Sequence, residues 1–443
     1  MKHIIIGNSA AGLSAAEQIR KNDKGCDIIV ITEESFRNYS KPLITYYLAD
    51  KLELEKVYFK DDDFYKKNDL DLKTNTKVVE IDTEGKRVVF DSGKGETFDK
   101  LLIANGGIPI IPGIKVIDRS DGKSLMLEEA MQKINGLFTL TTLEDAINIK
   151  NYILNKKIKS ASILGGGLIG MKTTEAFLEL GLKIDLIELA DRVLAATFDL
   201  KASSILENRI IEQMGSIYKR NTIEEIYIEK NNLSAFKLKD GRTIDSKLVI
   251  IAVGVDPDLS LVKKESILTG RGVIVDEYMS TTCKDIYAAG DVAESYDILS
   301  NTRRNIAIWP LAVRQGFIAG NNMSGGKCSY KGGFFKNSVE ILGVPSISMG
   351  ITNIEKGMGK GFEVFEEFEP LKNFYRKIIV KEGKVIGAIL IGNIERAGIY
   401  AGLINNKIDI SNVVQNIAKE DFGIIQLPSD YRKHLVVGEG IEV

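Results

Sequence analysis

The sequence of 443 residues has few side chains that could carry thiol or imidazole chemistry. Its three cysteines, Cys26, Cys283 and Cys328, lie far apart and have neither metal-site spacing nor a disulfide framework. Its histidines are His3 and His434. The chain therefore cannot hold a cysteine-ligated cluster of its own, and its thiols are typical of reduced, incidental cysteines in an intracellular protein.

Long apolar runs and blocks of one charge sign are also missing. No apolar stretch approaches the length of a membrane span, and the net charge of −2 includes no long single-sign block. We therefore expect neither a membrane nor a nucleic-acid partner. Because a core strand begins near residue 3, we expect no cleavable signal and a cytoplasmic location. The length allows two or three domains.

The first 34 residues have the pattern of a dinucleotide-binding βαβ unit. An apolar strand over 3–6 leads into a glycine turn, a helix of small residues follows, and a strand over 27–32 ends in Glu33 and Glu34. Such a helix start presents backbone N–H groups to a pyrophosphate, and an acid at the strand end can bind ribose hydroxyls. The turn comprises Gly7, Asn8, Ser9, Ala10, Ala11 and Gly12, with Ser9 in place of the usual middle glycine.

A second copy of this pattern begins near residue 161. Strand 161–164 precedes a complete fingerprint, a helix to about residue 180, and a strand over 183–187 that ends in Glu188. A tight structural turn alone would not explain this acid at the spacing expected for ribose binding. The fingerprint comprises Gly165, Gly166, Gly167, Leu168, Ile169 and Gly170.

The rest of the chain predicts further parallel-sheet strands and a different C-terminal module. We expect a loop and helix start at 39–43, a charged helical stretch through 67, a hairpin of 77–81 with 87–90, and a linker near Pro109 and Pro112. The other expected elements are strands 101–104, 248–253, 272–275 and 285–291, a helix over 310–322, adjacent strands 373–380 and 384–391, and a helix over 395–405.

Two nucleotide folds, a strand ending in Ala289-Gly290-Asp291 and an α+β tail together resemble the pyridine nucleotide-dependent flavoproteins of the disulfide reductase superfamily. The chain is most similar to the branch of NADH:rubredoxin and NADH:ferredoxin reductases, NADH oxidases and nitrite reductase large-subunit flavin domains. The resemblance implies an α/β fold class with two Rossmann-like domains, an FAD domain split by an inserted NAD domain, and a C-terminal α+β interface domain. The implied boundaries are 1–112 and 257–325 for FAD, 113–256 for NAD(H), and 326–443 for the interface domain.

The resemblance also implies which residues bind the two cofactors. Taken alone, Lys41 would be a solvated lysine and Trp309 a core aromatic, and only the matched context assigns them to the flavin. The residues expected at FAD are Gly7, Ser9, Ala10, Ala11, Gly12, Glu33, Glu34, Lys41, Pro42, Val79, Ala104, Asn105, Gly106, Gly290, Asp291, Trp309, Pro310 and Leu311. Those expected at NADH are Gly165, Gly167, Leu168, Ile169, Gly170, Glu188 and Gly254.

Lys172 is the candidate catalytic residue. In disulfide-reducing relatives, this position typically carries a glutamate near the nicotinamide and flavin N5, paired with a lysine. Here the partner region 43–46 contains no lysine. A cation at this position would favour electron density on reduced flavin. The alternative is a lysine on the exposed side of the helix.

The departures from the family pattern decide the expected chemistry. The loop 39–43, where disulfide-reducing relatives carry a cysteine, has none, and the setting of His434 does not match their C-terminal histidine. Thiol–disulfide exchange and cysteine-sulfenate cycles are therefore not expected. We expect an FAD-dependent NADH:acceptor oxidoreductase whose partner is an iron–sulfur electron-transfer protein or subunit, such as ferredoxin or rubredoxin. A homodimer or a hetero-complex is compatible with the sequence, and the alternatives are an NADH oxidase that reduces oxygen directly or a non-enzymatic redox-sensing module.

Overall fold

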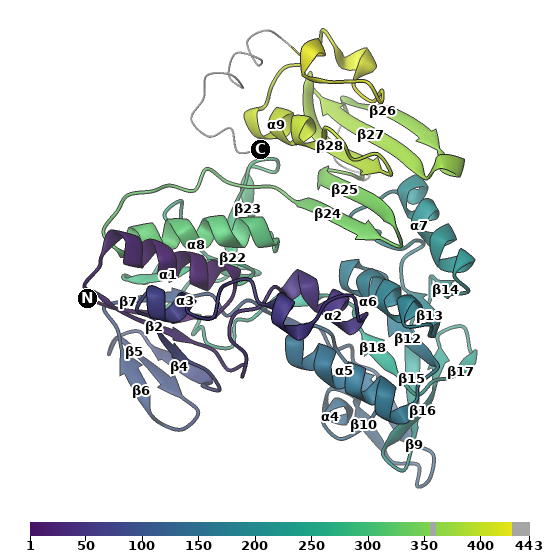
Figure 1. Ribbon diagram of the computed structural model, residues 1–443, viewed down its shortest axis with the longest axis horizontal. Coiled ribbons are helices and arrows are strands. Elements are labelled where there is room, and N and C mark those ends of the chain that lie inside the picture. The colour runs from purple at the N-terminus through teal and green to yellow at the C-terminus, as the bar shows by residue number, and fades with distance from the viewer. Residues whose placement is uncertain (355–359, 428–443) are drawn as a thin grey trace.

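The structure is a computed structural model that describes residues 1–354 and 360–427, so His434 lies outside the described residues. In Figure 1 the purple N-terminal segment lies beside the green segment near residue 315, the blue-green elements lie to one side, and a yellow-green sheet lies above both. Across the described ranges, no helix has the length and apolar character needed to cross a membrane.

The first dinucleotide unit is a parallel sheet with strand order β21-β7-β1-β2-β3. Its central strands are apolar without interruption because both faces of a parallel sheet are covered. Helices α1 (Ala10–Asn22) and α8 (Trp309–Met323) pack together (Figure 1), since side chains at Gly316 and Gly320 would collide with the α1 backbone. The strands are β1 (Lys2–Ile6), β2 (Asp27–Ile31), β3 (Asp71–Lys73), β7 (Lys100–Ile103) and β21 (Ile286–Ala288).

The prediction of a charged helical stretch through residue 67 is wrong, because the segment forms several short helices separated by loops. Asp50 has a φ of 59°, a left-handed conformation that ends the first short helix. Val57 and Phe64 are each buried, so separate anchors in the core override a continuous helical path. The short helices are η1 (Lys41–Leu43), α2 (Ile44–Leu48), η2 (Leu54–Val57) and α3 (Phe64–Lys67). The expected hairpin is confirmed as β4 (Val78–Asp82) and β5 (Arg87–Phe90), with β6 (Gly95–Thr97) added to it.

The second dinucleotide unit repeats the parallel arrangement, with strand order β11-β18-β12-β13-β14. Its elements are β11 (Leu137–Phe138), α5 (Leu143–Lys156), β12 (Ser160–Leu164), α6 (Leu168–Glu179), β13 (Lys183–Glu188), α7 (Leu200–Glu212), β14 (Ser216–Lys219) and β18 (Val249–Ile251). A second sheet covers it, which the sequence patterns did not predict. That sheet comprises β9 (Lys115–Asp118), β10 (Ser124–Met126), β15 (Ile223–Glu229), β16 (Asn232–Leu238) and β17 (Thr243–Asp245), with helix α4 (Leu127–Met131) beside it.

The chain passes between the two units twice, at adjacent places. Strand β8 (Gly107–Pro109) carries it out and β19 (Val255–Pro257) carries it back, and the two pair antiparallel. The linker expected near Pro109 is therefore one half of a two-stranded ribbon. A small sheet of β20 (Val273–Ile274), β22 (Ala293–Asp297) and β23 (Thr302–Arg304) follows the return passage.

The C-terminal module is an antiparallel sheet with a helix, as expected for an α+β module. It contacts the second unit: Asp199, the N-cap of α7, accepts hydrogen bonds from Tyr375 (2.7 Å) and Lys377 (2.8 Å). Its elements are β24 (Lys336–Ile341), β25 (Val344–Gly350), β26 (Phe362–Glu369), η3 (Pro370–Lys372), β27 (Phe374–Lys381), β28 (Lys384–Ile391), α9 (Ala397–Asn406), η4 (Val414–Asn416) and η5 (Ile424–Gln426).

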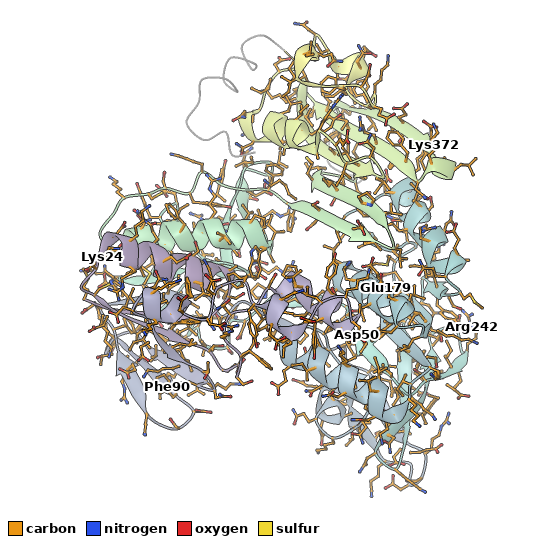
Figure 2. All side chains as sticks on the ribbon, in the orientation of Figure 1. Lys24, Asp50, Phe90, Glu179, Arg242 and Lys372 are labelled. Carbon is orange, nitrogen blue, oxygen red and sulfur yellow. The ribbon has the colours of Figure 1, made fainter. Side chains whose placement is uncertain are left out.

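Helix α2 of the first unit reaches across to the second unit. Figure 2 shows Asp50 and Glu179 in the central region where α2 meets α6. Lys51 forms an ion pair with Glu179, and Lys150 pairs with Asp50 at 2.5 Å. Buried residues of α2 and of the C-terminal sheet join the core of the second unit, so the three parts share one continuous apolar cluster.

Candidate functional site

The carboxyl ends of strands β1, β7 and β21 bring together the residues predicted at FAD. Gly7 follows β1, Ala104 follows β7 and Gly290 follows β21. A Cβ on Gly7 would collide with the carbonyl of Ala104, and one on Gly290 would lie 3.1 Å from the Cβ of Ala11. Gly7 (φ 122°) and Gly290 (φ 81°) also have backbone conformations that favour glycine, so glycine is required for this close approach.

The start of α1 is open to an anion. A Cβ on Gly12 would collide with the Gly7 carbonyl, so the strand–helix turn can close only with glycine. Ser9, the N-cap residue, makes no side-chain capping bond within the described part of the chain. The first backbone N–H groups of α1 are thus available for the pyrophosphate of FAD, which fits this turn despite the missing middle glycine.

A second group of polar residues lies at the same edge. Burial raises the pKa of Asp291 above its ordinary value, and the positive charge of Lys41 opposes that rise without cancelling it. Asn105 donates to a carboxylate oxygen of Asp258 at 2.9 Å. Its own side-chain oxygen is buried and has no partner among the described residues. This acceptor suits a donor group on a bound cofactor.

Helix α8 begins at this edge with the three residues predicted there, Trp309, Pro310 and Leu311. The Trp309 ring meets Phe59 edge to face, with centroids 5.2 Å apart. Gln315, one turn further on, accepts a hydrogen bond from the backbone N–H of Gly290 at 2.8 Å. The helix start is thereby fixed against the end of β21.

The acid expected on the ribose in the first unit is not at the equivalent position. The backbone N–H of Gly7 bonds to the Ile31 carbonyl, and that of Gly165 bonds to the Ile187 carbonyl. The next residues, Thr32 and Glu188, therefore occupy matching strand ends. Thr32 is not among the residues predicted from the sequence, because its equivalence to Glu188 depends on the hydrogen bonds that set the register of β2 against β1.

The two predicted acids beyond Thr32 have other partners. Glu33 is exposed and forms an ion pair with Lys77 at 3.3 Å. Glu34 accepts a hydrogen bond from the Tyr39 hydroxyl at 2.6 Å. Their contact with a ribose stays a prediction, and geometry favours Thr32 for that role.

The second unit holds its strand-end acid in a fixed orientation. One carboxylate oxygen of Glu188 accepts from the backbone N–H of Gly166 (2.5 Å), and the other accepts from that of Ala190 (2.6 Å). A Cβ on Gly170 would collide with the Gly165 carbonyl, whereas one on Gly167 would meet no described atom within 4 Å. Gly167 therefore leaves open space before α6, which suits the close approach of a dinucleotide.

Arg192, four residues after Glu188, is held within its own loop. Its guanidinium donates to the carbonyls of Phe198 (3.0 Å) and Ala195 (3.2 Å) and to the carboxylate of Asp191 (2.8 Å). A guanidinium fixed by three acceptors is poorly placed to attract a 2′-phosphate. Gly254, with a φ of 136°, begins the return passage beside Ile110, where an added Cβ would come within 3.3 Å.

Lys172 joins three parts of the molecule. Its ammonium donates to Glu175 in the same helix and to the carbonyl of Glu340 in β24 (3.0 Å), and it lies 4.5 Å from the centroid of the Tyr46 ring. The other carboxylate oxygen of Glu175 accepts from the backbone N–H of Leu342 at 2.7 Å. The lysine is largely buried, so it is not a solvated surface residue. A contact with nicotinamide stays a prediction.

Three other predicted residues are exposed. Lys41 and Pro42 lie in η1, and Val79 lies in β4 with 45% of its surface exposed. Ala10, Ala11, Leu168 and Ile169 form the first turns of α1 and α6, and Gly106 (φ 82°) follows Asn105 in the turn before β8. Their contact with the two cofactors stays a prediction.

The cysteines lie away from both nucleotide edges. Cys26 directly precedes β2 and Cys283 shortly precedes β21, so both lie at the amino ends of parallel strands. Cys328 lies beyond the C-terminal end of α8, where its backbone bonds to the side chain of Asn322. Nucleotides bind at the carboxyl ends of such strands, so the geometry keeps every thiol away from them.

Comparisons with known proteins agree with this geometry. Residues 1–316 match the family described as pyridine nucleotide-disulphide oxidoreductase, and residues 336–408 match the rubredoxin NAD+ reductase C-terminal domain. The chain is 28% identical to the nitrite reductase [NAD(P)H] of Bacillus subtilis over 94% of its own length and 49% of that protein's, so it spans about half of this relative. It is 27% identical to the NADH-dependent phenylglyoxylate dehydrogenase subunit epsilon of Aromatoleum evansii, over 93% of each chain. The crystal structure of NADH:rubredoxin oxidoreductase from Clostridium acetobutylicum matches with a TM-score of 0.74 and 27% identity, covering 94% of this chain and 98% of that one.

Proposed function

Because the chain belongs to the pyridine nucleotide-disulphide oxidoreductase family, we propose that it is an NADH:acceptor oxidoreductase that delivers electrons to an iron–sulfur protein. It is an NAD(H)-dependent flavoprotein with FAD and NADH as cofactors. FAD, when bound, accepts a hydride from NADH and can release electrons singly. The observation that carries the proposal is that all three cysteines lie away from the nucleotide edges, which leaves flavin-only transfer.

The chain's own residues would bind and orient the cofactors. In this proposal, residues 1–112 and 257–325 form the FAD domain, 113–256 the NAD(H) domain and 326–443 the interface domain. The start of α1 holds the FAD pyrophosphate, Asp291 bonds to the ribityl hydroxyls, and the N-terminus of α8 favours negative charge on the flavin ring. Glu188 and the turn before α6 hold NADH.

The partner follows from the chemistry and from the named relatives. An acceptor that takes one electron at a time suits a flavin that can give electrons singly, and the match at residues 336–408 supports rubredoxin or ferredoxin. The similarity to a protein named as subunit epsilon of a dehydrogenase supports a hetero-complex, and in this proposal the other subunit carries the iron–sulfur centre. A homodimer and a cytoplasmic location are part of the same proposal.

Anaerobic turnover tests the acceptor. We expect the FAD-loaded protein with NADH to reduce ferredoxin or rubredoxin at least tenfold faster than it consumes oxygen in air. Oxygen consumption faster than reduction of either carrier would instead establish an NADH oxidase. A long-lived charge-transfer complex without turnover would establish a redox sensor.

A thiol-free variant tests the mechanism. We expect the variant with Cys26, Cys283 and Cys328 all changed to serine to keep NADH-driven reduction of an artificial one-electron acceptor within about twofold, because no thiol lies near a nucleotide edge. Loss of this activity in a variant that keeps its FAD would contradict flavin-only transfer.

A further inference from the structure

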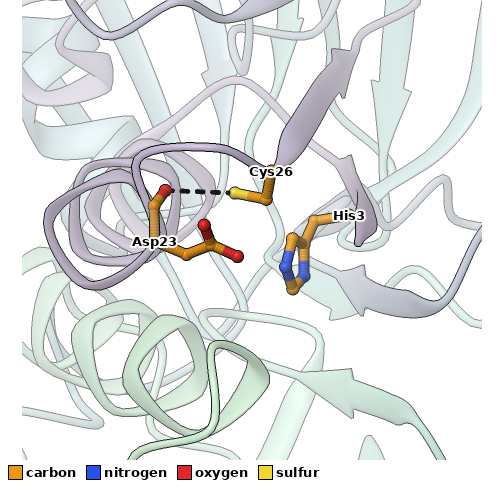
Figure 3. Close-up of side chains that lie close together, drawn as sticks. All are labelled: His3, Asp23 and Cys26. Atoms are coloured by element: carbon orange, nitrogen blue, oxygen red, sulfur yellow. Dashed lines mark hydrogen bonds between the residues drawn. The ribbon is translucent and has the colours of Figure 1, made fainter.

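Three potential metal ligands meet at the amino ends of the first two strands, opposite the nucleotide edge. Figure 3 shows His3 of β1, Asp23 at the C-terminal end of α1, and Cys26 just before β2, converging on one place. One imidazole nitrogen, one carboxylate oxygen and the sulfur all lie within 4.8 Å of one another.

His3 is the unusual member of the group. Its side chain is fully buried, and neither ring nitrogen has a hydrogen-bond partner among the described residues. Leaving a buried polar atom unpaired costs about 1–3 kcal/mol, so native proteins rarely do so. Zinc in proteins is bound by imidazole nitrogen, thiolate sulfur and carboxylate oxygen, and this group supplies one of each.

We propose that His3, Asp23 and Cys26 bind one zinc ion, with water in the fourth position. Ligand atoms in a tetrahedral zinc site lie about 3.5 Å apart, so the three side chains would have to move closer together when the ion binds. Cys26 would release its thiol proton to solvent on binding. Asp23 is partly exposed, which gives the ion a path from solvent.

The positive charge of Arg20 beside the site means that zinc would bind there only with Cys26 and Asp23 both in their anionic forms. The Arg20 guanidinium lies 3.9 Å from the Cys26 sulfur (Nη1 to Sγ) and is held by the carbonyls of Asn68 (2.8 Å) and Cys26 (2.9 Å). This fixed cation would repel a zinc ion bound only by neutral groups. A thiolate and a carboxylate cancel the charge of the ion, and the guanidinium then stabilises the thiolate.

The proposed ion would join three elements rather than take part in hydride transfer. It would tie β1, the end of α1 and the start of β2 together at the edge opposite the FAD pyrophosphate. Its loss should therefore lower thermal stability and leave NADH-driven flavin reduction unchanged, which separates this proposal from the proposed function.

Zinc content of the FAD-loaded protein tests the site. After treatment with a chelator, dialysis against equimolar zinc sulfate and desalting, we expect one zinc per chain by mass spectrometry. We expect less than a tenth of that in Cys26→Ser and in Asp23→Asn, two substitutions that preserve size. Cys283→Ser is the matched control and should keep its zinc.

X-ray absorption at the zinc edge supplies a second measurement. We expect one sulfur and otherwise nitrogen or oxygen neighbours in the wild-type protein. Failure to retain zinc, retention of wild-type zinc in Cys26→Ser, or a spectrum without sulfur would each overturn the proposal. FAD content reports that each variant is folded.

Discussion

The phenol of Tyr39 donates a hydrogen bond to Glu34 at 2.6 Å and accepts one from the backbone N–H of Leu143 at 3.2 Å. Leu143 begins helix α5 of the second unit, so this buried hydroxyl links the end of β2 to the other dinucleotide unit. Burial and the charge of Glu34 raise the pKa of Tyr39 above its usual range, which keeps the hydroxyl protonated.

Replacing this tyrosine should weaken the link. We expect Tyr39→Phe to lower the free energy of unfolding by about 1–2 kcal/mol, because the buried N–H of Leu143 and the partly buried carboxylate of Glu34 lose their partner. Urea unfolding followed by circular dichroism measures the change. Tyr296→Phe, which removes an exposed bond to Asn301, is the control and should cost less than half as much. An equal loss of unfolding free energy in the two variants would mean that the buried hydrogen bonds of Tyr39 stabilise the protein no more than an exposed one.

Thr32 should matter for FAD, since it occupies the position that Glu188 occupies in the second unit. We expect Thr32→Val to raise the Kd for FAD about fivefold, the equivalent of about 1 kcal/mol. Thr32→Ser keeps the hydroxyl and should bind as the wild type does. Flavin fluorescence titration of the apoprotein measures both. The opposite pattern, weak binding in Glu33→Gln and normal binding in Thr32→Val, would return the role to Glu33.

Glu188 should make the enzyme prefer NADH to NADPH. Its oxygens are fixed by two backbone N–H groups, and its charge would repel a 2′-phosphate while Arg192 stays bound in its loop. We expect kcat/KM for NADH to exceed that for NADPH at least tenfold, and Glu188→Gln to narrow the ratio. Glu212→Gln, an exposed change at the end of α7, should not alter it. Equal values for the two coenzymes in the wild type would refute the assignment.

Lys172 should influence the flavin as well as the packing. If Lys172 acts on the flavin as predicted, Lys172→Glu replaces a cation by an anion there and should lower the flavin potential and slow its reduction by NADH about tenfold. FAD content should not change. Redox titration and stopped-flow absorbance provide the two readouts, with Lys51→Gln on the same surface of contact as control. An unchanged reduction rate and potential would mean that Lys172 has only a structural role, the contact between α6 and β24.

Asp285 should make stability depend on pH. Lys100 (2.5 Å) and Lys86 (2.6 Å) hold its pKa near 2, below the ordinary 3.8. A lowered pKa in the folded state stabilises the protein above about pH 4, and this contribution disappears as the pH falls towards 2. We expect Asp285→Asn to cost on the order of 1 kcal/mol at pH 7 and nearly nothing at pH 2, measured by urea unfolding. A cost that does not vary with pH would contradict the ion-pair explanation.

The elements that the sequence predicts well are those with a local signal. Gly7, Gly12, Gly165 and Gly170 mark their turns because each is required by a backbone that passes within contact distance. The paired strands 77–81 and 87–90 follow from their own alternation. These signals need no knowledge of distant residues.

The features that sequence reasoning missed depend on distant partners. Lys172 meets the carbonyl of Glu340, which lies 168 residues away in the chain. Thr32 is recognised only when hydrogen bonds set the register of β2 against β1. The helical stretch beyond residue 44 is broken because Val57 and Phe64 enter the core separately, which no local periodicity reveals.

The paired passages β8 and β19 bear on how such an enzyme could be rebuilt. Because Pro109 lies opposite Val255, the inserted segment between them begins and ends at adjacent points beside the first unit. A short turn could join β8 directly to β19, or a different segment could be inserted between them, without breaking any strand of the first sheet. A replacement segment with a different coenzyme preference would leave the strands of the flavin unit unbroken, but it would have to keep the apolar surface that packs against α2 and the C-terminal sheet.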